Sequence, residues 1–428
     1  MLTKTLLILI ALIGLSVPVA AALGWLGLTL QYLESPMPLY RAIGDIFWQN
    51  GTDFLLVAIP MFVMLGEILL RSGITEKMYD GMSHWLGWLP GGLMHSNIGS
   101  SALFAATSGS SVATAATIGT VAVSQIEKRG YNERLFLGTI AAGGTLGILI
   151  PPSINLILYG VLTDTSVPEL YLAGFIPGLL LALLFMLSIT VACLVFREWG
   201  GETINSSLME KIKSLPGLIP PLGIFAVVVG SIYAGLATPT EAASLGVVGA
   251  FVLAYINKAL SFEMLRETLE GTMRTTAMIM LIILAAVFLN FVLSVIGLTQ
   301  LLSDFINGLN WTPFQTMLMI IGFYIVLGCF METLSMLLTT APLITPIVVG
   351  LGYDPVWFGI LLMVLLETAL ITPPIGINLY VVQGVRQRGG PMSDIMIGVL
   401  PFVIAMFVLV ALLLALPDLA LWLPSQFY

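Results

Sequence analysis

The residues that could carry chemistry interrupt four otherwise apolar segments. Hydroxyl residues and glycine interrupt SSALFAATSGSSV at positions 100–112, and a glutamate interrupts GCFMETLS at positions 328–335. The other two segments contain Pro151-Pro152 and Pro373-Pro374. Proline lacks an N–H donor and clashes with the preceding turn, so a helix breaks there. The pattern predicts two re-entrant hairpins and two broken helices, whose irregular backbone is tolerated in a membrane only against protein or a water-filled cavity.

Broken helices offer two kinds of binding group. Free carbonyls and C-terminal helix ends attract Na⁺, whereas N-terminal ends attract a carboxylate. Hydroxyl side chains at the interruptions add neutral oxygen ligands: Ser108, Ser110, Ser111, Thr145, Thr333, Thr368 and Thr372. The alternative is that small residues only allow helices to pack closely. That alternative suffices for any single serine, but the four interrupted elements together favour a cation site.

Acidic residues in apolar surroundings are the second group of candidates, because a charge inside a membrane usually serves function. They are Glu67, Glu241, Glu332 and Glu367. Glu332, at a predicted hairpin tip, is the best candidate for a place near a cation or at a gate. Glu67 and Glu241 fit structural roles, and the order Thr238-Pro239-Thr240-Glu241 predicts a helix cap.

Composition identifies the class of protein. Of 428 residues, 58% are hydrophobic and only 9% are charged, with a mean hydropathy of +1.04. Soluble domains carry about 25% charged residues, and this apolar content fills about a dozen spans of roughly 20 residues. The chain is therefore an all-α polytopic membrane protein. A soluble enzyme, a nucleic-acid binder, a disulfide-rich domain and a β-barrel are excluded, the last because the apolar runs are continuous.

Catalytic and metal-binding motifs are missing from the sequence. The two cysteines, Cys193 and Cys329, lie in apolar runs, and His84 and His95 lack partners that would complete a metal site. No Walker lysine motif and no Ser-His-Asp set can be assembled. We expect no enzymatic activity, no nucleic-acid partner and no cofactor other than Na⁺ as a coupling ion.

The hydropathy pattern predicts thirteen helices and two amphipathic interfacial stretches, 38–50 and 297–311. The apolar run that starts at Leu6 is too long for a signal peptide, so we expect a retained first helix. The polar stretch 197–214 separates two halves of similar size. The predicted helices cover 5–30, 53–71, 85–107, 110–127, 133–160, 169–196, 216–234, 240–257, 273–296, 313–330, 333–349, 355–384 and 394–416.

An internal repeat relates the two halves. Gly130-Tyr131-Asn132 recurs as Gly352-Tyr353-Asp354, and Pro151-Pro152 recurs as Pro373-Pro374, both at an offset of 222 residues. Each proline pair is followed by Ile-Asn-Leu, with one residue inserted before Asn378. Two matches at one offset favour a true repeat over common turn chemistry.

Charge gives the repeats opposite directions, because cytoplasmic loops collect lysine and arginine. Lys128, Arg129 and Arg134 surround the first Gly-Tyr pair, whereas 350–357 has no basic residue. After the proline pairs the bias reverses, with Asp164 and Glu169 in the first half and Arg386 and Arg388 in the second. This is the pattern of inverted-topology repeats in secondary transporters.

Four motifs together resemble the large membrane subunit of TRAP transporters, which are tripartite, ATP-independent and dependent on a periplasmic binding protein. The resemblance extends over essentially the whole chain. The motifs are GTLGILIPPS at 144–153, LAGFIPG at 172–178, ATPTEAA at 237–243 and ITPPIGIN at 371–378.

The resemblance implies an ion-transporter-superfamily fold, in which a scaffold holds a transport domain that moves as a Na⁺-driven elevator. It assigns 1–84 to N-terminal scaffold helices, 85–165 to transport repeat one, and 166–310 to scaffold helices and connecting arms. Residues 311–390 form transport repeat two, and 391–428 form a C-terminal scaffold helix.

The resemblance also places the sites. One Na⁺ site would be framed by Ser108, Ser111, Gly144 and Thr145, and the other by Gly328, Cys329, Thr368 and Thr372. Cys329 and Glu332 depart from the serine-rich first tip, which leaves backbone carbonyls as alternative ligands of the second site. The substrate would enter between the hairpin tips. Its expected contacts are Ser108, Gly109, Ser110, Pro151, Pro152, Asn155, Glu332, Thr333, Pro373, Pro374 and Asn378.

We therefore expect a Na⁺-coupled importer subunit in the bacterial inner membrane. Its partners would be a separate small membrane subunit, a periplasmic substrate-binding protein and a small carboxylate such as a C4-dicarboxylate, sialic acid, a keto acid or a sugar acid. The alternatives are a stand-alone Na⁺/divalent-anion symporter of the same superfamily, an ABC-type permease, which Glu-Ala-Ala at 241–243 faintly resembles, and a channel.

Overall fold

A computed structural model gives the structure of the chain. It describes residues 4, 5, 7, 8, 11, 12, 15, 17–298, 300, 301, 304, 308, 309, 311–386 and 389–427. These residues form helices and loops, and the only β pairing among them is an isolated bridge between Tyr131 and Gly200. The predicted all-α class is confirmed.

Seven helical segments are long and apolar enough to cross a membrane, and a bent pair can provide an eighth span. The long helices outside the predicted hairpins and broken helices are α4 (Ala58–Arg71, after η2, Phe54–Val57), α12 (Val167–Val195), α13 (Leu208–Tyr233), α14 (Pro239–Ile256), α15 (Phe262–Val295) and α21 (Met392–Ala415). Shorter elements beside them are α2 (Val19–Glu34), η1 (Leu39–Ala42), α3 (Ile43–Gly51), η3 (Arg197–Trp199), α22 (Asp418–Leu421) and η4 (Pro424–Gln426).

The first half contains one hairpin and one broken helix, as the interruptions predict. The hairpin turns at Gly109, whose φ of 61° lies in the left-handed region that favours glycine. The broken helix ends at Leu149 and resumes at Ile154, with a bend of 41° across the proline pair. The elements are α5 (Ile74–Leu86), α6 (Leu93–Ser108), α7 (Ser111–Ala122), α8 (Gln125–Lys128), α9 (Glu133–Gly144), α10 (Leu146–Leu149) and α11 (Ile154–Thr163).

The second half repeats this order. Its hairpin turns between Gly328 and Thr333, and its broken helix stops at Ile371 and resumes at Ile377. Asn132 and Asp354, which are equivalent in the repeat, both cap the helix that follows them. The elements are α17 (Pro313–Gly328), α18 (Thr333–Gly350), α19 (Pro355–Ile371) and α20 (Ile377–Val385).

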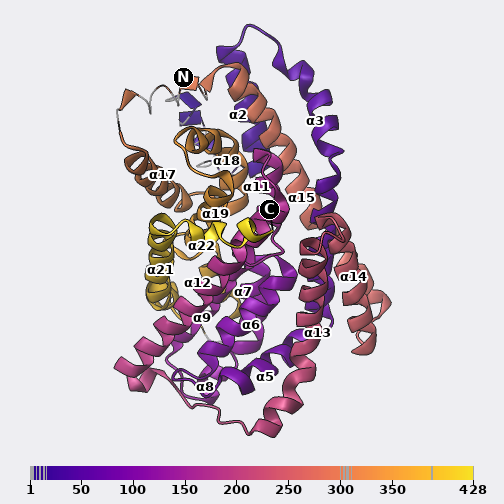
Figure 1. The fold of residues 1–428 in the computed structure, drawn as a ribbon, viewed down its shortest axis with the longest axis vertical. Coiled ribbons are helices and arrows are strands. Elements are labelled where there is room, and N and C mark those ends of the chain that lie inside the picture. Colours follow the sequence, from indigo (N-terminus) through magenta and orange to yellow (C-terminus); the bar gives the residue numbers. More distant parts are fainter. Residues whose placement is uncertain are drawn as a thin grey trace.

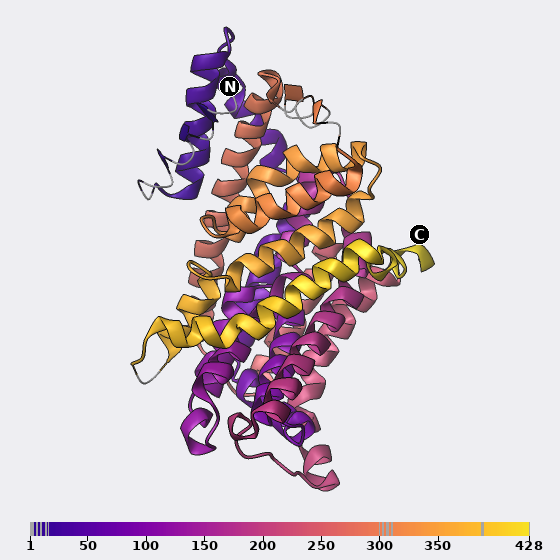
Figure 2. The same ribbon diagram turned by 90° about the vertical axis from the view of Figure 1, so that its left-hand side faces the viewer.

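The two broken helices run in opposite directions. At one end of the molecule, the Arg386 Nε donates to the Glu133 carboxylate at 2.7 Å, so the end of α20 lies at the start of α9. At the other end, the Tyr159 hydroxyl donates to the Pro355 carbonyl at 2.7 Å, so the end of α11 lies at the start of α19. The hairpins accordingly lie toward opposite ends, with α17 and α18 in the upper part and α6 and α7 in the lower part (Figures 1 and 2). The predicted inverted topology is confirmed.

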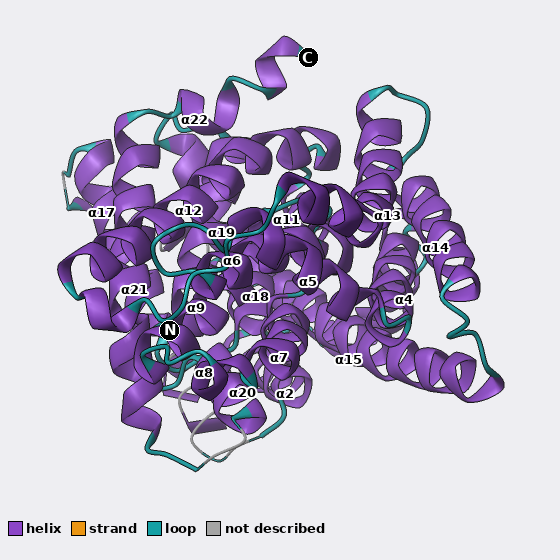
Figure 3. Cartoon of the chain, turned by 90° about the horizontal axis from the view of Figure 1, so that it is seen from below, coloured by secondary structure: helices purple, strands orange, loops and turns teal. Residues whose placement is uncertain are grey.

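The helices pack in two groups. In the view from below, α4, α13, α14 and α15 lie on one side and α9, α12, α19 and α21 on the other (Figure 3). Helix α21 packs so closely along α9 that a Cβ on Gly138 would clash with the Gly398 carbonyl oxygen. Helix α12 packs against α19 and α21. Helices α12 and α21, which the expected division placed within 166–310 and 391–428, therefore pack against the broken helices.

Several predicted helix boundaries were wrong. The helix predicted over 85–107 begins only at Leu93, because Gly91 and Gly92 have positive φ and the Leu93 N–H donates to the Tyr131 hydroxyl. Helix α5 was missed because its residues are largely polar. Helices α13 and α15 start earlier than predicted, at polar turns capped by Ser207 and Ser261.

The predictions at the N-terminus and in two loops are only partly covered. Helix α2 begins after Pro18, and Leu6 of the predicted first helix lies outside the described residues. The stretch 38–50 is helical, as η1 and α3, whereas much of 297–311 lies outside the described residues, as does Arg388.

Candidate functional site

A cavity of about 390 Å³ lies between the two hairpin tips. The first tip contributes residues 108–113, the second contributes Glu332, Thr333 and Leu334, and α11 contributes Ile154 and Asn155. Helices α4 and α15 close the opposite wall, with Glu67 and Thr275 among their lining side chains. The cavity therefore lies where both halves meet the long helices.

Three helices begin at this cavity. They are α7, α11 and α18, whose N-caps are Ser110, Ser153 and Glu332. The first-turn N–H groups of a helix carry partial positive charge and attract anions. No lysine or arginine is among the residues that line the cavity. Backbone dipoles are thus its main source of positive potential.

Asn155 adds a side-chain donor to the cavity. The residue is 5% exposed, and its Nδ2 has no hydrogen-bond partner among the described residues. A buried amide without a partner is costly unless a ligand or water accepts from it. Its place in the lining, beside the start of α11, makes it a donor for an anion or a hydroxyl group.

Glu332 occupies the position equivalent to Ser110, at the same offset of 222 residues. Its carboxylate accepts from the backbone N–H groups of Leu334 and Ser335 at 3.0 and 3.1 Å. The residue also lines a second cavity of about 260 Å³, which extends to α2. The Glu332 carboxylate therefore neutralises the partial positive charge at the N-terminus of α18. Ser110 is uncharged and does not neutralise the N-terminus of α7.

The residues predicted for the first Na⁺ site lie close together. The start of α7 packs so tightly on the broken helix that a Cβ on Gly144 would lie 3.1 Å from the Ser111 carbonyl oxygen. A Cβ on Gly147 would lie 2.6 Å from the Ser111 nitrogen. Thr145 is fully buried, and its hydroxyl donates to the Ala142 carbonyl at 2.6 Å. A hydroxyl that donates its hydrogen in this way keeps its oxygen lone pairs free for a cation.

The same arrangement recurs at the second predicted Na⁺ site. Thr368 donates to the Val364 carbonyl and Thr372 to the Thr368 carbonyl, both at 2.7 Å. A Cβ on Gly328 would lie 2.5 Å from that of Ala369, so α17 and α19 touch there. The Cys329 thiol lies 3.4 Å from the Ile325 carbonyl. Hydroxyl oxygens and backbone groups surround this break, and Glu332 of the second tip lines the adjoining cavity together with Gly328 and Ala369.

The predicted substrate contacts divide into two groups. Six of them line the cavities: Ser108, Gly109, Ser110, Asn155, Glu332 and Thr333. The other five are not among the lining residues: Pro151, Pro152, Pro373, Pro374 and Asn378. Asn378 is fully buried and its amide donates to the Ala141 carbonyl at 3.2 Å, so it joins α20 to α9. The Pro152 carbonyl instead supports the hairpin turn at Gly109.

The four acids in apolar surroundings have different environments. Glu241 forms a capping box with Thr238, as predicted. Glu67 pairs with Arg71, which also pairs with Glu267, and it lines the cavity. The sequence favours Glu332 over Glu367 as a functional residue. Glu367 is nevertheless fully buried, and it connects the two halves. Apart from Glu67 itself, no residue pattern predicted that α4 and α15 form a wall of the cavity.

Comparison with known proteins adds the family to this geometry. Residues 6–419 match the model of the family described as tripartite ATP-independent periplasmic transporter, DctM component. The sialic acid TRAP transporter large permease SiaM of Vibrio cholerae is 32% identical over 96% of this chain and 99% of its own length. The C4-dicarboxylate TRAP transporter large permease DctM of Rhodobacter capsulatus is 32% identical over 98% of this chain and 97% of its own.

A solved structure supports the fold alone. The crystal structure of the YdaH transporter of Alcanivorax borkumensis, described as having an unusual topology, matches with a TM-score of 0.66 at 15% identity. The match covers 97% of this chain and 98% of that one. The arrangement of helices is therefore shared with a transporter of distant sequence.

Proposed function

This chain belongs to the DctM component family of tripartite ATP-independent periplasmic transporters, and we propose that it imports a small organic acid by Na⁺ coupling. It is a TRAP large permease, a multi-pass protein of the inner membrane. The observation that carries the proposal is the cavity on which the N-termini of α7 and α11 and the Asn155 amide converge, with no lysine or arginine among its described lining residues. Such a cavity suits a carboxylate.

The names of relatives support a carboxylate substrate. Besides the sialic acid and C4-dicarboxylate permeases, a 2,3-diketo-L-gulonate TRAP transporter large permease of Escherichia coli is 30% identical over 86% of this chain. Each of these compounds carries a carboxylate, and they differ in the remainder of the molecule. The first tip would hold the carboxylate. We therefore propose small organic acids as the substrate class.

Na⁺ coupling rests on the two breaks. Each brings buried hydroxyl oxygens, tightly packed glycine and broken backbone together, and hard oxygen ligands of this kind suit Na⁺. The residues that would hold the ion are Ser108, Ser111, Gly144 and Thr145 at the first break and Gly328, Cys329, Thr368 and Thr372 at the second. The ion would neutralise part of the substrate charge, which the cavity lining does not.

The packing supports an elevator movement as the transport mechanism. The moving body would comprise the hairpins and broken helices together with α12 and α21, and the framework would comprise α2, α4 and α13–α15. The cavity lies at the border of the two, between the hairpin tips and α4 with α15. Movement of the body along this border would carry the cavity from one face of the membrane to the other.

Two partner proteins belong to the proposal. A small permease would brace the framework, and a periplasmic binding protein would deliver the substrate. The isethionate TRAP transporter permease DctMQ of Oleidesulfovibrio alaskensis matches 94% of this chain, which covers 63% of that longer protein. We place the small permease of the present system on a separate chain.

Uptake by proteoliposomes that contain this chain and both partners tests the function. A panel of labelled sialic, C4-dicarboxylic, keto and sugar acids should reveal one acid whose uptake requires an inward Na⁺ gradient and the binding protein. Uptake that persists without the gradient contradicts Na⁺ coupling. Uptake that needs Na⁺ but no binding protein would identify a stand-alone symporter, and dependence on ATP would identify an ABC-type permease.

A further inference from the structure

Glu367 is a carboxyl group buried between the two halves of the protein. It lies in α19, in the second half, and is 0% exposed. Its Oε1 accepts from the Ser111 hydroxyl at 2.7 Å and from the Ile148 N–H at 2.9 Å, both in the first half. Glu367 thus joins the start of α7 to the last turn before the first break.

The other carboxyl oxygen of Glu367, Oε2, is buried and has no hydrogen-bond partner among the described residues. None of the ion pairs within that part of the chain involves Glu367. An isolated buried charge is costly, so a buried carboxyl group stays protonated, pairs with a cation or binds a metal ion. Glu367 has no cation among its described partners, which leaves Oε2 available to a proton or to a bound cation.

A second unpaired oxygen lies in the same cluster. Asn378 is also fully buried, and its Oδ1 has no partner among the described residues. A Cβ on Gly144 would lie 2.9 Å from the Asn378 Nδ2 and 3.1 Å from the Ser111 carbonyl oxygen, so these groups surround one glycine. Ser111 is itself bonded to Glu367. Two unpaired oxygens and the residues of the first break therefore gather at one place.

We propose that Glu367 is the anionic member of the first Na⁺ site and that it reaches this site from the opposite half of the molecule. The inference rests on the Na⁺ coupling proposed above and adds a residue that the hairpin and break of the first half do not supply. The position equivalent to Glu367 in the first half, at the offset of 222 residues, is Thr145. The second site accordingly lacks this carboxylate, and the first site binds Na⁺ more tightly.

The test is Na⁺-dependent thermal stabilisation of the purified protein, with choline chloride to hold the ionic strength constant. Ligand binding stabilises the folded state by RT ln(1 + c/Kd), where c is the Na⁺ concentration, so the unfolding midpoint starts to rise where c reaches Kd. E367Q keeps an oxygen that accepts from Ser111 and Ile148, so it should fold, but the Na⁺ concentration at which its midpoint starts to rise should be at least about tenfold higher. The control E241Q changes a carboxyl group at the cap of α14, outside both cavities, and should respond like the wild type.

The outcomes separate this inference from the proposed function. The amide of E367Q has the shape of a protonated carboxyl group but cannot carry a negative charge. A Na⁺ response in E367Q equal to that of the wild type therefore overturns the inference and leaves Na⁺ coupling itself standing. A wild-type protein that Na⁺ does not stabilise overturns both. If E367Q does not fold, the pair E367D and E367N decides. They have equal length, and E367D should respond at a lower Na⁺ concentration than E367N; equal responses overturn the inference.

Discussion

Asn155 and Asn378 have the same sequence neighbours but different surroundings. Each lies between isoleucine and leucine just after a proline pair, yet Asn155 lines the cavity and Asn378 donates to Ala141. The residue inserted before Asn378 lies in the loop between the proline pair and α20, and both asparagines are the second residue of their helix. The motif therefore predicted that both lie near a break, but not which of them faces the substrate.

Asn155→Leu should raise the KM for uptake about tenfold or more. The substitution keeps the branching and the number of heavy atoms of the side chain and removes the donor, and a hydrogen bond to a charged group contributes about 1.5–3 kcal/mol. Concentration-dependent uptake in proteoliposomes measures the effect. Thr190→Val, in α12 away from the cavity, is the control and should leave KM unchanged. An unchanged KM in the Asn155 variant would remove this residue from the substrate site.

The first Na⁺ site has its own residue-scale prediction. Thr145→Val removes a buried oxygen while preserving shape, so the Na⁺ concentration for half-maximal uptake should rise by about tenfold. Thr139→Val is a matched control, since Thr139 is equally buried in α9 but is not one of the predicted ligands. Equal Na⁺ dependence in both variants would contradict the role of Thr145.

At the scale of elements, the proline pairs and the charges predicted the breaks and the inverted topology, whereas several predicted helix boundaries were wrong. Both breaks follow from the proline pairs, which act locally on the backbone. The break at Gly91 and Gly92 could not be predicted, because it depends on the Tyr131 hydroxyl, which accepts from the Leu93 N–H and donates to the Glu202 carbonyl. Contacts between residues so distant in sequence leave no local pattern.

The contact between α4 and the first hairpin tip lies on the proposed border of the moving body. A Cβ on Gly66 would lie 3.4 Å from the Ser108 backbone, which leaves room for a methyl group but not for a longer side chain. Gly66→Leu should therefore slow uptake at least about tenfold while the protein still folds. The comparison is Gly223→Leu in α13, where nothing lies within 4 Å. Similar uptake rates in the two variants would contradict a moving contact at Gly66.

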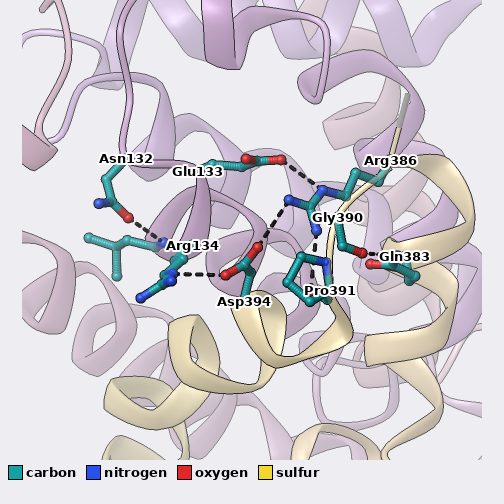
Figure 4. Close-up of polar contacts among 9 residues, drawn as sticks. Asn132, Glu133, Arg134, Gln383, Arg386, Gly390, Pro391 and Asp394 are labelled. Atoms are coloured by element: carbon teal, nitrogen blue, oxygen red, sulfur yellow. Dashed lines mark hydrogen bonds and ion pairs between the residues drawn. The ribbon is translucent and has the colours of Figure 1, made fainter. Parts of the chain in front are cut away.

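At the scale of the molecule, an ion-pair network joins the two halves (Figure 4). Arg386 pairs with Glu133 and with Asp394, which also pairs with Arg134 at 2.9 Å. Burial disfavours the charge of Arg386, but the hydrogen bonds that the guanidinium donates to Glu133 and Asp394 outweigh burial and raise the pKa of the guanidinium. The sequence predicted that these basic residues share one face of the membrane, but the acidic partners depend on how α21 packs on α9.

Arg386→Ala should lower the free energy of unfolding by about 1.5–3 kcal/mol, since it removes charged hydrogen bonds at a side chain that is only 5% exposed. Arg266→Ala removes an ion pair whose side chains are 70% and 63% exposed, and should have a much smaller effect because solvent screens the pair. Thermal unfolding of both purified variants measures the difference. Equal midpoints would show that the network does not hold the halves together.

The movement of one body against the framework is the central claim, and pulsed electron–electron resonance distances test it most directly. Spin labels at Ile404 of α21 and Ile219 of α13 span the proposed border, whereas labels at Ile404 and Leu187 of α12 lie within the moving body, all at exposed positions. In a background without native cysteines, Na⁺, substrate and both partner proteins should shift the first distance between two populations and leave the second unchanged. A first distance that stays single under all conditions, or a second that changes with it, would contradict the account.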